Sequence, residues 1–430
     1  MPSTRPARIV MATFEFDMIR AGGLGTVVTA LCRALDHSIY EPVVVLPRAG
    51  FSVPWRRAGS RSYEGCDVEI FDHAGTEVWL LSNEVFDTDL YPPIAEVGGP
   101  NGSFTKADEY GKQLANVLPD MKAGVLHLHD AFGSRALPAA RAARIPSVLT
   151  VHALHSQYPC VSREENYAAD LVDIVTTVSA SYGREHEAFF GAPRRTRVVP
   201  NGADLSYWAL EAAPGGPTAA ARAERLRDLL ARHSLPMAPT FAYLGRLDPF
   251  QKGVDVLVSA YQRLTSANLA DFNLLIYGDG ELDMRQKVGA LAQEASNHVS
   301  FSPGMISASE MRSILGAVDC VLIPSLFEPF GLIQLEALAM GSLVIASRTG
   351  GLQDVMIEIG HDGGFGRLVT PGSDAGLADA MLELNRLARG SPTELLQELR
   401  TLGRARARLF SARSMAEGYE GLYAELLART

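Results

Sequence analysis

The sequence is poor in cysteine and has no long apolar segment. Its 430 residues include four cysteines, none of them spaced as a Cys-x-x-Cys pair, so neither a zinc site nor a disulfide framework is indicated. No apolar run approaches the roughly 20 residues that a membrane-spanning helix needs. The first residues also lack the apolar core of a signal peptide. These absences predict a protein of a reducing compartment, and we expect it in the cytoplasm.

Positive charge is also scarce. The formal net charge is −10, and only five of the 39 basic residues are lysines. A surface of this average charge repels polyanions, so we expect neither a nucleic-acid partner nor a membrane partner. Any phosphate that the protein binds must therefore meet a local basic pocket. The composition does not indicate an oligomeric state.

Short apolar runs alternate with helical patterns along nearly the whole chain, which is typical of βαβ units and parallel sheets. The predicted strands are 9–13, 43–47, 78–81, 125–129, 147–151, 174–178, 197–200, 240–245, 272–277, 299–302, 320–324, 344–347 and 366–369. A Pro- and Gly-rich stretch within residues 208–223 separates two such series. We therefore expect an α/β protein with two Rossmann-like domains that face a central cleft. The first spans residues 1–208, with the last helix, 411–430, packing back on it, and the second spans 209–410.

A glycine-rich turn follows the first strand and precedes a helical pattern. It runs from Arg20 to Gly25, with Gly22 and Gly23 in its centre. Such a turn presents backbone N–H groups at a helix N-terminus, where they favour a pyrophosphate. The alternative is a tight turn that needs glycine only for its backbone conformation. The spacing differs from that of the dinucleotide-binding GxGxxG motif.

Two basic residues follow the first strand of the second series. Arg246 comes directly after this strand, and Lys252 precedes the next helix beside Gly253. Both can reach the crevice at the carboxyl ends of the strands, where open α/β sheets bind ligands. Two cations at this point would neutralise a diphosphate leaving group. The alternative, that they are solvated surface charges, is weakened because lysine is so rare in this chain.

The most specific motif runs from Pro324 to Ala337. A strand leads into a loop that contains Glu328, and a helix begins at Gly331 and carries Glu336 about one and a half turns later. Gly331 leaves the helix N-terminus open for a phosphate. The two carboxylates, eight residues apart, are expected to lie at opposite ends of a bound nucleotide sugar rather than to act as an acid/base couple. The alternative is that both are surface charges.

Together these motifs resemble those of a known enzyme family. Glu328 and Glu336 match the E-x7-E motif of retaining glycosyltransferases with the GT-B fold, and the set is similar to the glycogen (starch) synthases of bacteria and archaea. The further matching segments are Arg20–Gly23, His129–Asp130, Thr150–His152, Asn201–Asp204, Arg246–Gly253 and Thr349–Asp354, in the same order as in the family. The similarity extends from Phe14 to Tyr423.

The resemblance implies a retaining α-glycosyltransferase that moves a glucosyl-type sugar from a nucleoside diphosphate donor to a carbohydrate or small hydroxyl acceptor. It also implies roles for individual residues. The implied catalytic residues are His152, Glu328, Arg246 and Lys252; the donor-binding residues are Arg20, Gly22, Gly23, Gly331, Leu332 and Glu336; and Asp130 and Asn201 lie near the sugar or the acceptor. No cofactor is expected, and GT-B enzymes generally need no metal ion.

Three positions depart from the family pattern. Arg20 replaces a lysine, and Ala131 and Ala412 stand where tryptophan is common. An arginine keeps the charge of lysine but changes its hydrogen-bond geometry. The alternative function is therefore a glycosyltransferase of oligosaccharide or secondary-metabolite biosynthesis that uses another donor, such as a dTDP- or UDP-sugar, and a small acceptor such as a maltooligosaccharide.

Two further classes of protein share this scaffold. A GT-B epimerase or phosphorylase is one, and a phosphorylase would need a lysine that carries pyridoxal phosphate. The second is a sugar-binding protein without activity. Such a protein would not need Arg246, Lys252, Glu328 and His152 at the same time. His127 and His129 alternate on one strand face as a metal pair can, yet no carboxylate or cysteine follows at ligand spacing, so no metal site is predicted.

Overall fold

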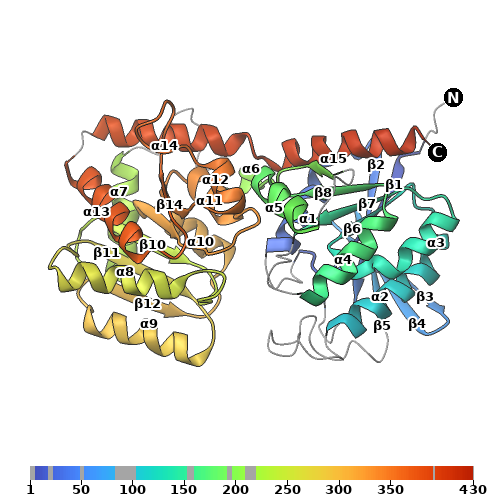
Figure 1. Cartoon of the computed structure of the whole chain (residues 1–430), viewed down its shortest axis with the longest axis horizontal. Coiled ribbons are helices and arrows are strands. Elements are labelled where there is room, and N and C mark those ends of the chain that lie inside the picture. The colour runs from blue at the N-terminus through green and yellow to red at the C-terminus, as the bar shows by residue number, and fades with distance from the viewer. Residues whose placement is uncertain are drawn as a thin grey trace. The chain divides into compact units, whose positions relative to one another are not determined.

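A computed structural model describes residues 5–17, 23–48, 53–82, 103–152, 159–190, 196–208, 219–390 and 393–429 of the chain. The chain divides into two compact units (Figure 1). Unit 1 comprises Met1–Gly202 and Ala412–Thr430, and unit 2 comprises Ala203–Ser411. The sequence placed this boundary after Trp208. Residues 203–208 fall in unit 2 because the short helix α6 (Leu205–Trp208) packs against α11 (Leu332–Ala339) of that unit.

Unit 1 is built on one mixed sheet. Among the described residues its strands follow the order β3-β4-β5-β2-β1-β6-β7-β8-β9. Their bounds are β1 Ala7–Ala12, β2 Tyr40–Pro47, β3 Arg56–Tyr63, β4 Cys66–His73, β5 Thr76–Ser82, β6 Val125–His129, β7 Ser147–Val151, β8 Ile174–Thr177 and β9 Thr196–Val198. The strands from β5 to β9 across the sheet pair in parallel, which places their carboxyl ends at one edge.

The predicted α/β class is confirmed, but the sequence missed two strands. β3 and β4 form an antiparallel hairpin that adds to β5 at the edge of the unit 1 sheet. The β3 residues are mostly exposed, and their sequence, RRAGSRSY, carries almost no apolar residues. An edge strand that buries so little side-chain surface leaves no apolar pattern from which it can be predicted.

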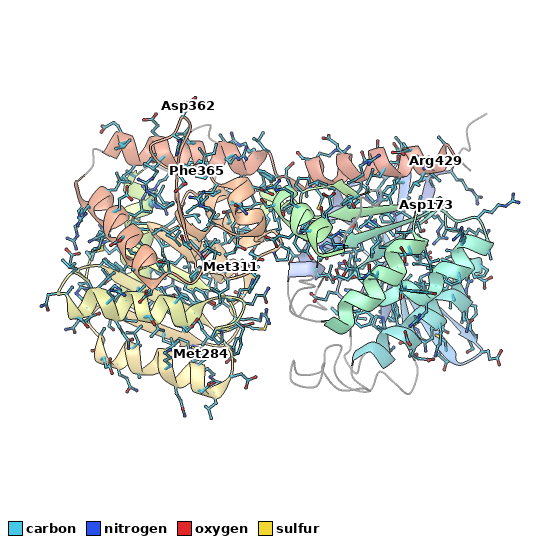
Figure 2. All side chains as sticks on the ribbon, in the orientation of Figure 1. Asp173, Met284, Met311, Asp362, Phe365 and Arg429 are labelled. Carbon is cyan, nitrogen blue, oxygen red and sulfur yellow. The ribbon has the colours of Figure 1, made fainter. Side chains whose placement is uncertain are left out.

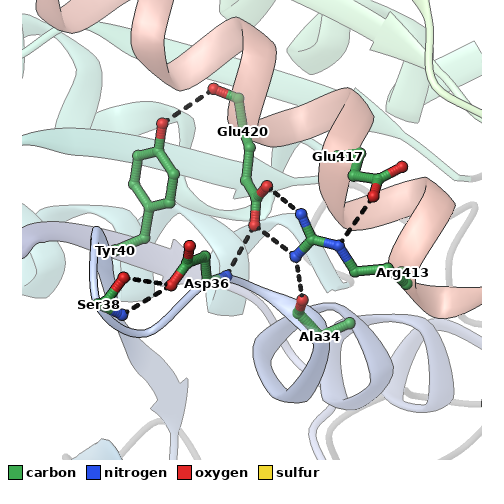
Figure 3. Close-up of polar contacts among 7 residues, drawn as sticks. All are labelled: Ala34, Asp36, Ser38, Tyr40, Arg413, Glu417 and Glu420. Carbon is green, nitrogen blue, oxygen red and sulfur yellow. Dashed lines mark hydrogen bonds and ion pairs between the residues drawn. The ribbon is translucent and has the colours of Figure 1, made fainter.

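The helices of unit 1 include the last helix of the chain. They are α1 Gly23–Ala34, α2 Ser103–Val117, α3 Leu137–Ala142, α4 Pro159–Leu171, α5 Ala180–Phe190 and α15 Ala412–Leu427. Helix α15 packs beside α1 and on β6. Polar contacts hold it there (Figure 3): Arg413 pairs with Glu420 at 2.6 Å and donates to the Ala34 carbonyl at 2.8 Å. The Glu420 carboxylate accepts from Asp36 N, and the Tyr40 hydroxyl donates to the Glu420 carbonyl.

Unit 2 contains a parallel sheet in the strand order β12-β11-β10-β13-β14-β15. The strands are β10 Thr240–Leu244, β11 Asn273–Gly278, β12 Val299–Pro303, β13 Cys320–Ile323, β14 Leu343–Ser347 and β15 Arg367–Val369. The remaining helices are α7 Ala219–Arg232, α8 Val254–Ser266, α9 Leu282–Glu294, α10 Ala308–Leu315, α12 Gly350–Val355, α13 Asp374–Gly390 and α14 Thr393–Arg408. Its core lies between the strands and α8, α9 and α13, and includes Met284, which Figure 2 labels.

Each sheet reverses the direction of its strand order at one place. In unit 1 the chain runs from β1 through β2 to β3 at the sheet edge, comes back through β4 and β5, and then places β6 on the other side of β1. In unit 2 it runs from β10 outward to β12 and returns to place β13 beside β10. Crossovers leave in opposite directions at such a switch point, so the carboxyl ends of the two strands border a crevice that binds ligands in open α/β sheets. The topology therefore selects the ends of β1, β6, β10 and β13.

Candidate functional site

In unit 2, the loops that follow β10 and β13 are joined at the switch point. Leu326 N donates to the carbonyl of Gln251 at 2.8 Å. Gly253, with φ of 62°, precedes α8, and a Cβ at this position would overlap the carbonyl oxygen of Pro324. Only glycine combines this left-handed backbone with so close an approach. The Lys252–Gly253 turn is therefore fixed against the end of β13.

Lys252 and Glu328, predicted from two separate motifs, form an ion pair across these loops. Lys252 Nζ lies 2.6 Å from Glu328 Oε2, and the two side chains are 24% and 11% exposed. Ser325 also donates to Glu328 Oε2, at 3.4 Å. Gly351 N, in the Thr349–Asp354 motif, donates to the Glu328 carbonyl at 3.2 Å. The residue is thus held at both its carboxylate and its backbone, which contradicts the alternative that it is a solvated surface charge.

Arg246 belongs to the same loop but is more accessible. Its side chain is half exposed, contacts the Gln251 side-chain oxygen and lies 3.7 Å from the Asp248 carboxylate. Asp248 in turn accepts from Gln251 N at 3.0 Å. The buried Tyr243 hydroxyl donates to the Arg246 carbonyl, and burial raises the pKa of this tyrosine. The loop is therefore ordered while the guanidinium group faces solvent.

Helix α11 begins at the same place and has an open N-terminus. Gly331, with φ of 88°, is its N-cap, and within the described residues no side chain caps the amides that follow, from Leu332 onward. In contrast, Ser307 caps α10 by accepting from Glu310 N. Uncapped amides at a helix N-terminus favour an anion. Glu336, on the second turn of α11, is only 6% exposed, so it is no surface charge either.

In unit 1, Asp130 connects the ends of β6 and β7 at the corresponding edge. Its Oδ1 accepts from His152 N at 2.6 Å, and its own N donates to the Thr150 carbonyl at 2.8 Å. The backbone of Asp130 has a φ of 59°, which costs about 1–3 kcal/mol for a residue other than glycine and is common at functional sites. The structure thus brings together His152, predicted to be catalytic, and Asp130, predicted to lie near the sugar or the acceptor.

The ring of His152 is held by a second histidine that the sequence analysis did not assign to the site. His129 Nδ1 lies 3.0 Å from His152 Nε2, and His129 is fully buried. Burial lowers the pKa of His152 to about 3 and that of His129 well below its usual value, so both rings are neutral near pH 7. His129 Nε2 is buried and has no hydrogen-bond partner in the described part of the chain.

The hydrogen-bond pattern assigns the tautomers of these two rings. An unpaired buried N–H is rarer than an unpaired acceptor, so His129 carries its hydrogen on Nδ1 and donates it to His152 Nε2. His152 then carries its own hydrogen on Nδ1, where it can donate to a ligand.

His127 connects the same strand to the C-terminal helix. Its Nδ1 lies 2.7 Å from the Tyr423 hydroxyl, and its Nε2 lies 2.6 Å from Thr150 Oγ1. Both ring nitrogens are occupied, so His127 has none left for a metal ion, contrary to the alternative of a His127–His129 metal pair. Among the described residues, no group of three or more His, Cys, Asp or Glu side chains is arranged to hold a metal.

Asn201 lies beyond β9 and is 5% exposed. Its backbone N donates to the Val178 carbonyl at 3.1 Å, but its side-chain Oδ1 is buried without a partner in the part of the chain that the structure describes. A buried oxygen that accepts no hydrogen bond destabilises the fold by roughly 1–3 kcal/mol. A ligand hydroxyl would supply the missing donor.

The glycine-rich turn is described only in part. Arg20 and Gly22 lie outside the described residues, and Gly23 begins α1. Gly25 N donates to the carboxylate of the buried Glu15 at 3.2 Å. The expectation of bare amides therefore needs correction, because an internal carboxylate takes one amide of the first turn. Glu15 belongs to none of the predicted motifs, although a carboxylate just beyond a buried strand could have indicated it.

Two family models match the chain. "Glycosyltransferase Family 4" matches residues 21–207, and "Glycosyl transferases group 1" matches residues 238–386. The first span includes Asp130 and His152 of unit 1, and the second includes Lys252 and Glu328 of unit 2. Within the described residues, no helix is both long and apolar enough to cross a membrane.

Curated relatives and solved structures are similar over nearly the whole chain. Glycogen synthase of Rhodopseudomonas palustris is 28% identical and covers 83% of this chain and 85% of its own. Glycogen synthase of Opitutus terrae is 27% identical, and the match covers 97% of this chain and 99% of the relative. Among solved structures, the catalytic domain of starch synthase IV from Arabidopsis thaliana, bound to ADP and acarbose, has a TM-score of 0.79 and is 20% identical. The match covers 99% of this chain and 100% of that domain. Sucrose-phosphate synthase of Thermosynechococcus elongatus superimposes with a TM-score of 0.75 at 21% identity. This match also covers 99% of this chain and 100% of the other.

Proposed function

Because this chain is a glycogen synthase-like glycosyltransferase with the GT-B fold, we propose that it moves a glucosyl residue from a nucleoside diphosphate sugar to a glucan hydroxyl with retention of configuration. Its relatives are named glycogen synthases, and the similar starch synthase domain is bound to ADP and acarbose. ADP-glucose is therefore the proposed donor, and an α-glucan is the proposed acceptor.

The Lys252–Glu328 ion pair at the switch point of unit 2 is the observation that carries this proposal. When the glycosidic bond to the diphosphate breaks, negative charge develops on the leaving group. Lys252, Arg246 and the open N-terminus of α11 would stabilise this charge electrostatically. As Lys252 turns to the phosphate, Glu328 is released to accept hydrogen bonds from the sugar hydroxyls. Glu336 would hold the ribose.

The residues at the switch point of unit 1 suit the sugar rather than the phosphate. His152 is neutral and offers an N–H, Asp130 is fixed by its bond to His152 N, and Asn201 offers an acceptor oxygen. These donors and acceptors bind sugar hydroxyls without adding a positive charge beside the developing oxocarbenium ion. We propose that these three residues hold the transferred sugar and the acceptor, and that Gly22 and Gly23 meet the donor.

The proposal is tested by incubating the enzyme with ADP-glucose and maltooligosaccharides. Mass spectrometry should show extension by hexose units, and NMR should show α-linkages. Lys252→Ala is the inactive control, and UDP-, GDP- and dTDP-glucose test the donor base. A folded, nucleotide-binding enzyme that extends no chain would overturn the glucan assignment and favour a small acceptor. A β-linked product would overturn retention.

The same assay tests the metal requirement. Basic side chains and helix amides would take the place of a metal ion at the diphosphate, so turnover should persist in EDTA. Loss of activity in EDTA that Mg²⁺ restores would contradict this arrangement.

A further inference from the structure

The segment that ends unit 2 contacts the donor motif, Pro324–Ala337. Helix α14 lies against α11 (Figure 1), and the chain passes into unit 1 after Ser411. Phe410, in the short segment between α14 and this point, has no part in the proposed donor site. Its ring nevertheless packs against that of Phe330, with the ring centroids 6.0 Å apart and the planes tilted by 58°. This separation is typical of attractive aromatic pairs.

Phe330 can transmit this support to the groups beside it. It is buried, with 3% of its surface exposed, and lies between Glu328 and Gly331, the N-cap of α11. Glu328 is proposed to act on the sugar, and the N-terminus of α11 on the diphosphate. A shift of the Phe330 ring would therefore displace groups on both sides of the bond that breaks.

Arg406 links Phe410 to helix α12. Its guanidinium group lies 5.1 Å from the centre of the Phe410 ring, close enough for a cation–π contact. Its Nε donates to the Val355 carbonyl at 2.9 Å, and its Nη2 donates to the Asp354 carbonyl at 2.7 Å. These are the last two residues of α12, where the helix dipole favours a cation. Arg406 thereby holds both the Phe410 ring and the C-terminal end of α12.

The other end of α12 holds the donor motif. Gly351 N donates to the Glu328 carbonyl at 3.2 Å and to the Pro329 carbonyl at 3.1 Å. A Cβ added at Gly331 would overlap Leu352 Cδ2, so α12 also packs directly against the N-cap of α11. Helix α12 therefore fixes the backbone of the donor motif at two points.

We propose that Phe410 and Arg406 are positioning residues of the donor site, which hold the segment from Glu328 to Gly331 in place through Phe330 and α12. Phe410 is itself anchored, because its carbonyl accepts from Ala203 N at 3.0 Å. Neither side chain needs to touch the donor. This role rests on the proposed function, in which Glu328 acts on the transferred sugar.

Conservative substitutions in the full-length enzyme measure this role. Phe410→Leu removes the ring but keeps an apolar side chain. It should lower kcat with ADP-glucose and maltooligosaccharides by about tenfold, because a small displacement of a group at the reacting sugar is costly. Phe410→Tyr keeps the ring and should restore turnover. Arg406→Gln should also lower kcat, whereas Arg408→Gln, at an exposed arginine of the same helix, should not.

A double-mutant cycle with Glu328→Gln separates positioning from a general loss of structure. Phe410→Leu should lose most of its effect on kcat in the Glu328→Gln enzyme, because the group that it positions is already altered. Full additivity of the two effects would overturn the inference. Phe272→Leu, in the unit 2 core at the amino end of β11, controls for lost stability and should leave kcat unchanged.

Hydrogen exchange measures the same contacts without turnover. The Gly351 amide donates to the donor motif, so exchange in the peptide 349–356 reports whether α12 and the motif stay joined. In ligand-free Phe410→Leu this peptide should exchange roughly two- to tenfold faster, as the loss of one aromatic contact implies. The peptide of β11 should keep its wild-type rate.

The two methods distinguish a failure of this role from a failure of the proposed function. A wild-type enzyme that extends no glucan would overturn the proposed function, and hydrogen exchange would then decide the role of Phe410 alone. Unchanged exchange of the peptide 349–356 in Phe410→Leu would overturn that role whichever donor the enzyme uses.

Discussion

The two switch points occupy the same position in their sheets but differ in charge. In unit 2 the loops carry Lys252, Glu328 and Arg246, which are ionic and partly exposed. In unit 1 the strand ends carry the buried His129 and the half-buried His152, whose rings are neutral, together with the carboxylate of Asp130. One topology thus supports two kinds of polar surface, and the local sequence decides which. The surface with two cations suits a diphosphate, and the surface of neutral rings and acceptor oxygens suits sugar hydroxyls.

The two surfaces also differ in what holds them in place. The unit 2 loops are supported locally, because the segments after β10 and β13 bond to each other. In unit 1, support comes from the far end of the chain: Thr150 Oγ1 lies 3.0 Å from the Tyr419 hydroxyl, and His127 Nδ1 lies 2.7 Å from that of Tyr423. Substitutions in unit 2 should therefore change chemistry, whereas those beneath the unit 1 site should change stability as well.

The largest expected effect is on turnover, from loss of a cation in unit 2. Lys252→Ala and Arg246→Ala should each lower kcat by roughly a hundredfold or more, because the leaving diphosphate loses a positioned cationic partner. Lys287→Ala, at an exposed lysine of α9, is the matched control and should keep wild-type activity. Steady-state kinetics decides the matter: wild-type turnover in both loop variants would contradict the phosphate assignment.

The two glutamates should separate catalysis from binding. Glu328→Gln should lower kcat by about a hundredfold with little change in the Kd of free ADP, because its carboxylate acts on the sugar. Glu336→Gln should instead weaken ADP by about tenfold, which corresponds to one charge-assisted hydrogen bond of about 1.4 kcal/mol. Calorimetry and initial rates measure both, with the solvent-facing Glu187→Gln of α5 as control. Identical profiles for the two variants would show that they do not hold opposite ends of the donor.

The strands that position the site could be predicted from the sequence, since parallel strands buried on both faces appear as continuous apolar runs. The run 240–245, for example, corresponds to β10, Thr240–Leu244. The hairpin strand β3 could not be predicted, because its side chains alternate without an apolar face. Burial, rather than strand formation itself, leaves the detectable pattern.

The candidate site was predictable where residues lie in short motifs. Lys252 and Glu328 were each identified, but their contact at 2.6 Å depends on the pairing of β10 with β13. The support of His152 by His129 depends likewise on the register of β6 and β7. Tyr423 lies 296 residues after His127, and no local pattern connects them.

The buried histidines of unit 1 should make stability depend on pH in a way that the unit 2 site does not. Burial lowers the pKa of His127 and His152 to about 3, whereas in the unfolded chain it is near 6.5. Below pH 6.5 the unfolded chain therefore binds protons first, so the free energy of unfolding falls with decreasing pH. Each such histidine adds about 1.4 kcal/mol per pH unit to the slope.

Urea unfolding at pH 6.5, 6.0 and 5.5 measures this slope, and His127→Gln should reduce it by the contribution of one histidine. The absolute stability of that variant does not enter the comparison. A slope that His127→Gln leaves unchanged would show that this histidine is not held neutral in the folded protein.

The smallest expected effect tests the support that α15 gives to unit 1. Thr176 donates to the Leu149 carbonyl, so Thr150 donates to Thr176 and accepts from His127 Nε2–H. His127 Nδ1 is then an acceptor, and its donor is the Tyr423 hydroxyl at 2.7 Å. Tyr423→Phe removes this donor and leaves a buried ring nitrogen unpaired, which should lower the free energy of unfolding by about 1–3 kcal/mol.

Tyr419→Phe provides the contrast, because Thr150 keeps His127 as a second donor when the Tyr419 hydroxyl is removed. Tyr419→Phe should lower the free energy of unfolding by less, about 0.5–1.5 kcal/mol, which is the usual net contribution of one hydrogen bond. Both variants keep the aromatic ring and its packing, so urea unfolding at pH 7 isolates the hydroxyl groups. If Tyr419→Phe were the more destabilising of the two, the hydrogens of this network would have to run in the opposite direction, with His127 donating from Nδ1 to Tyr423.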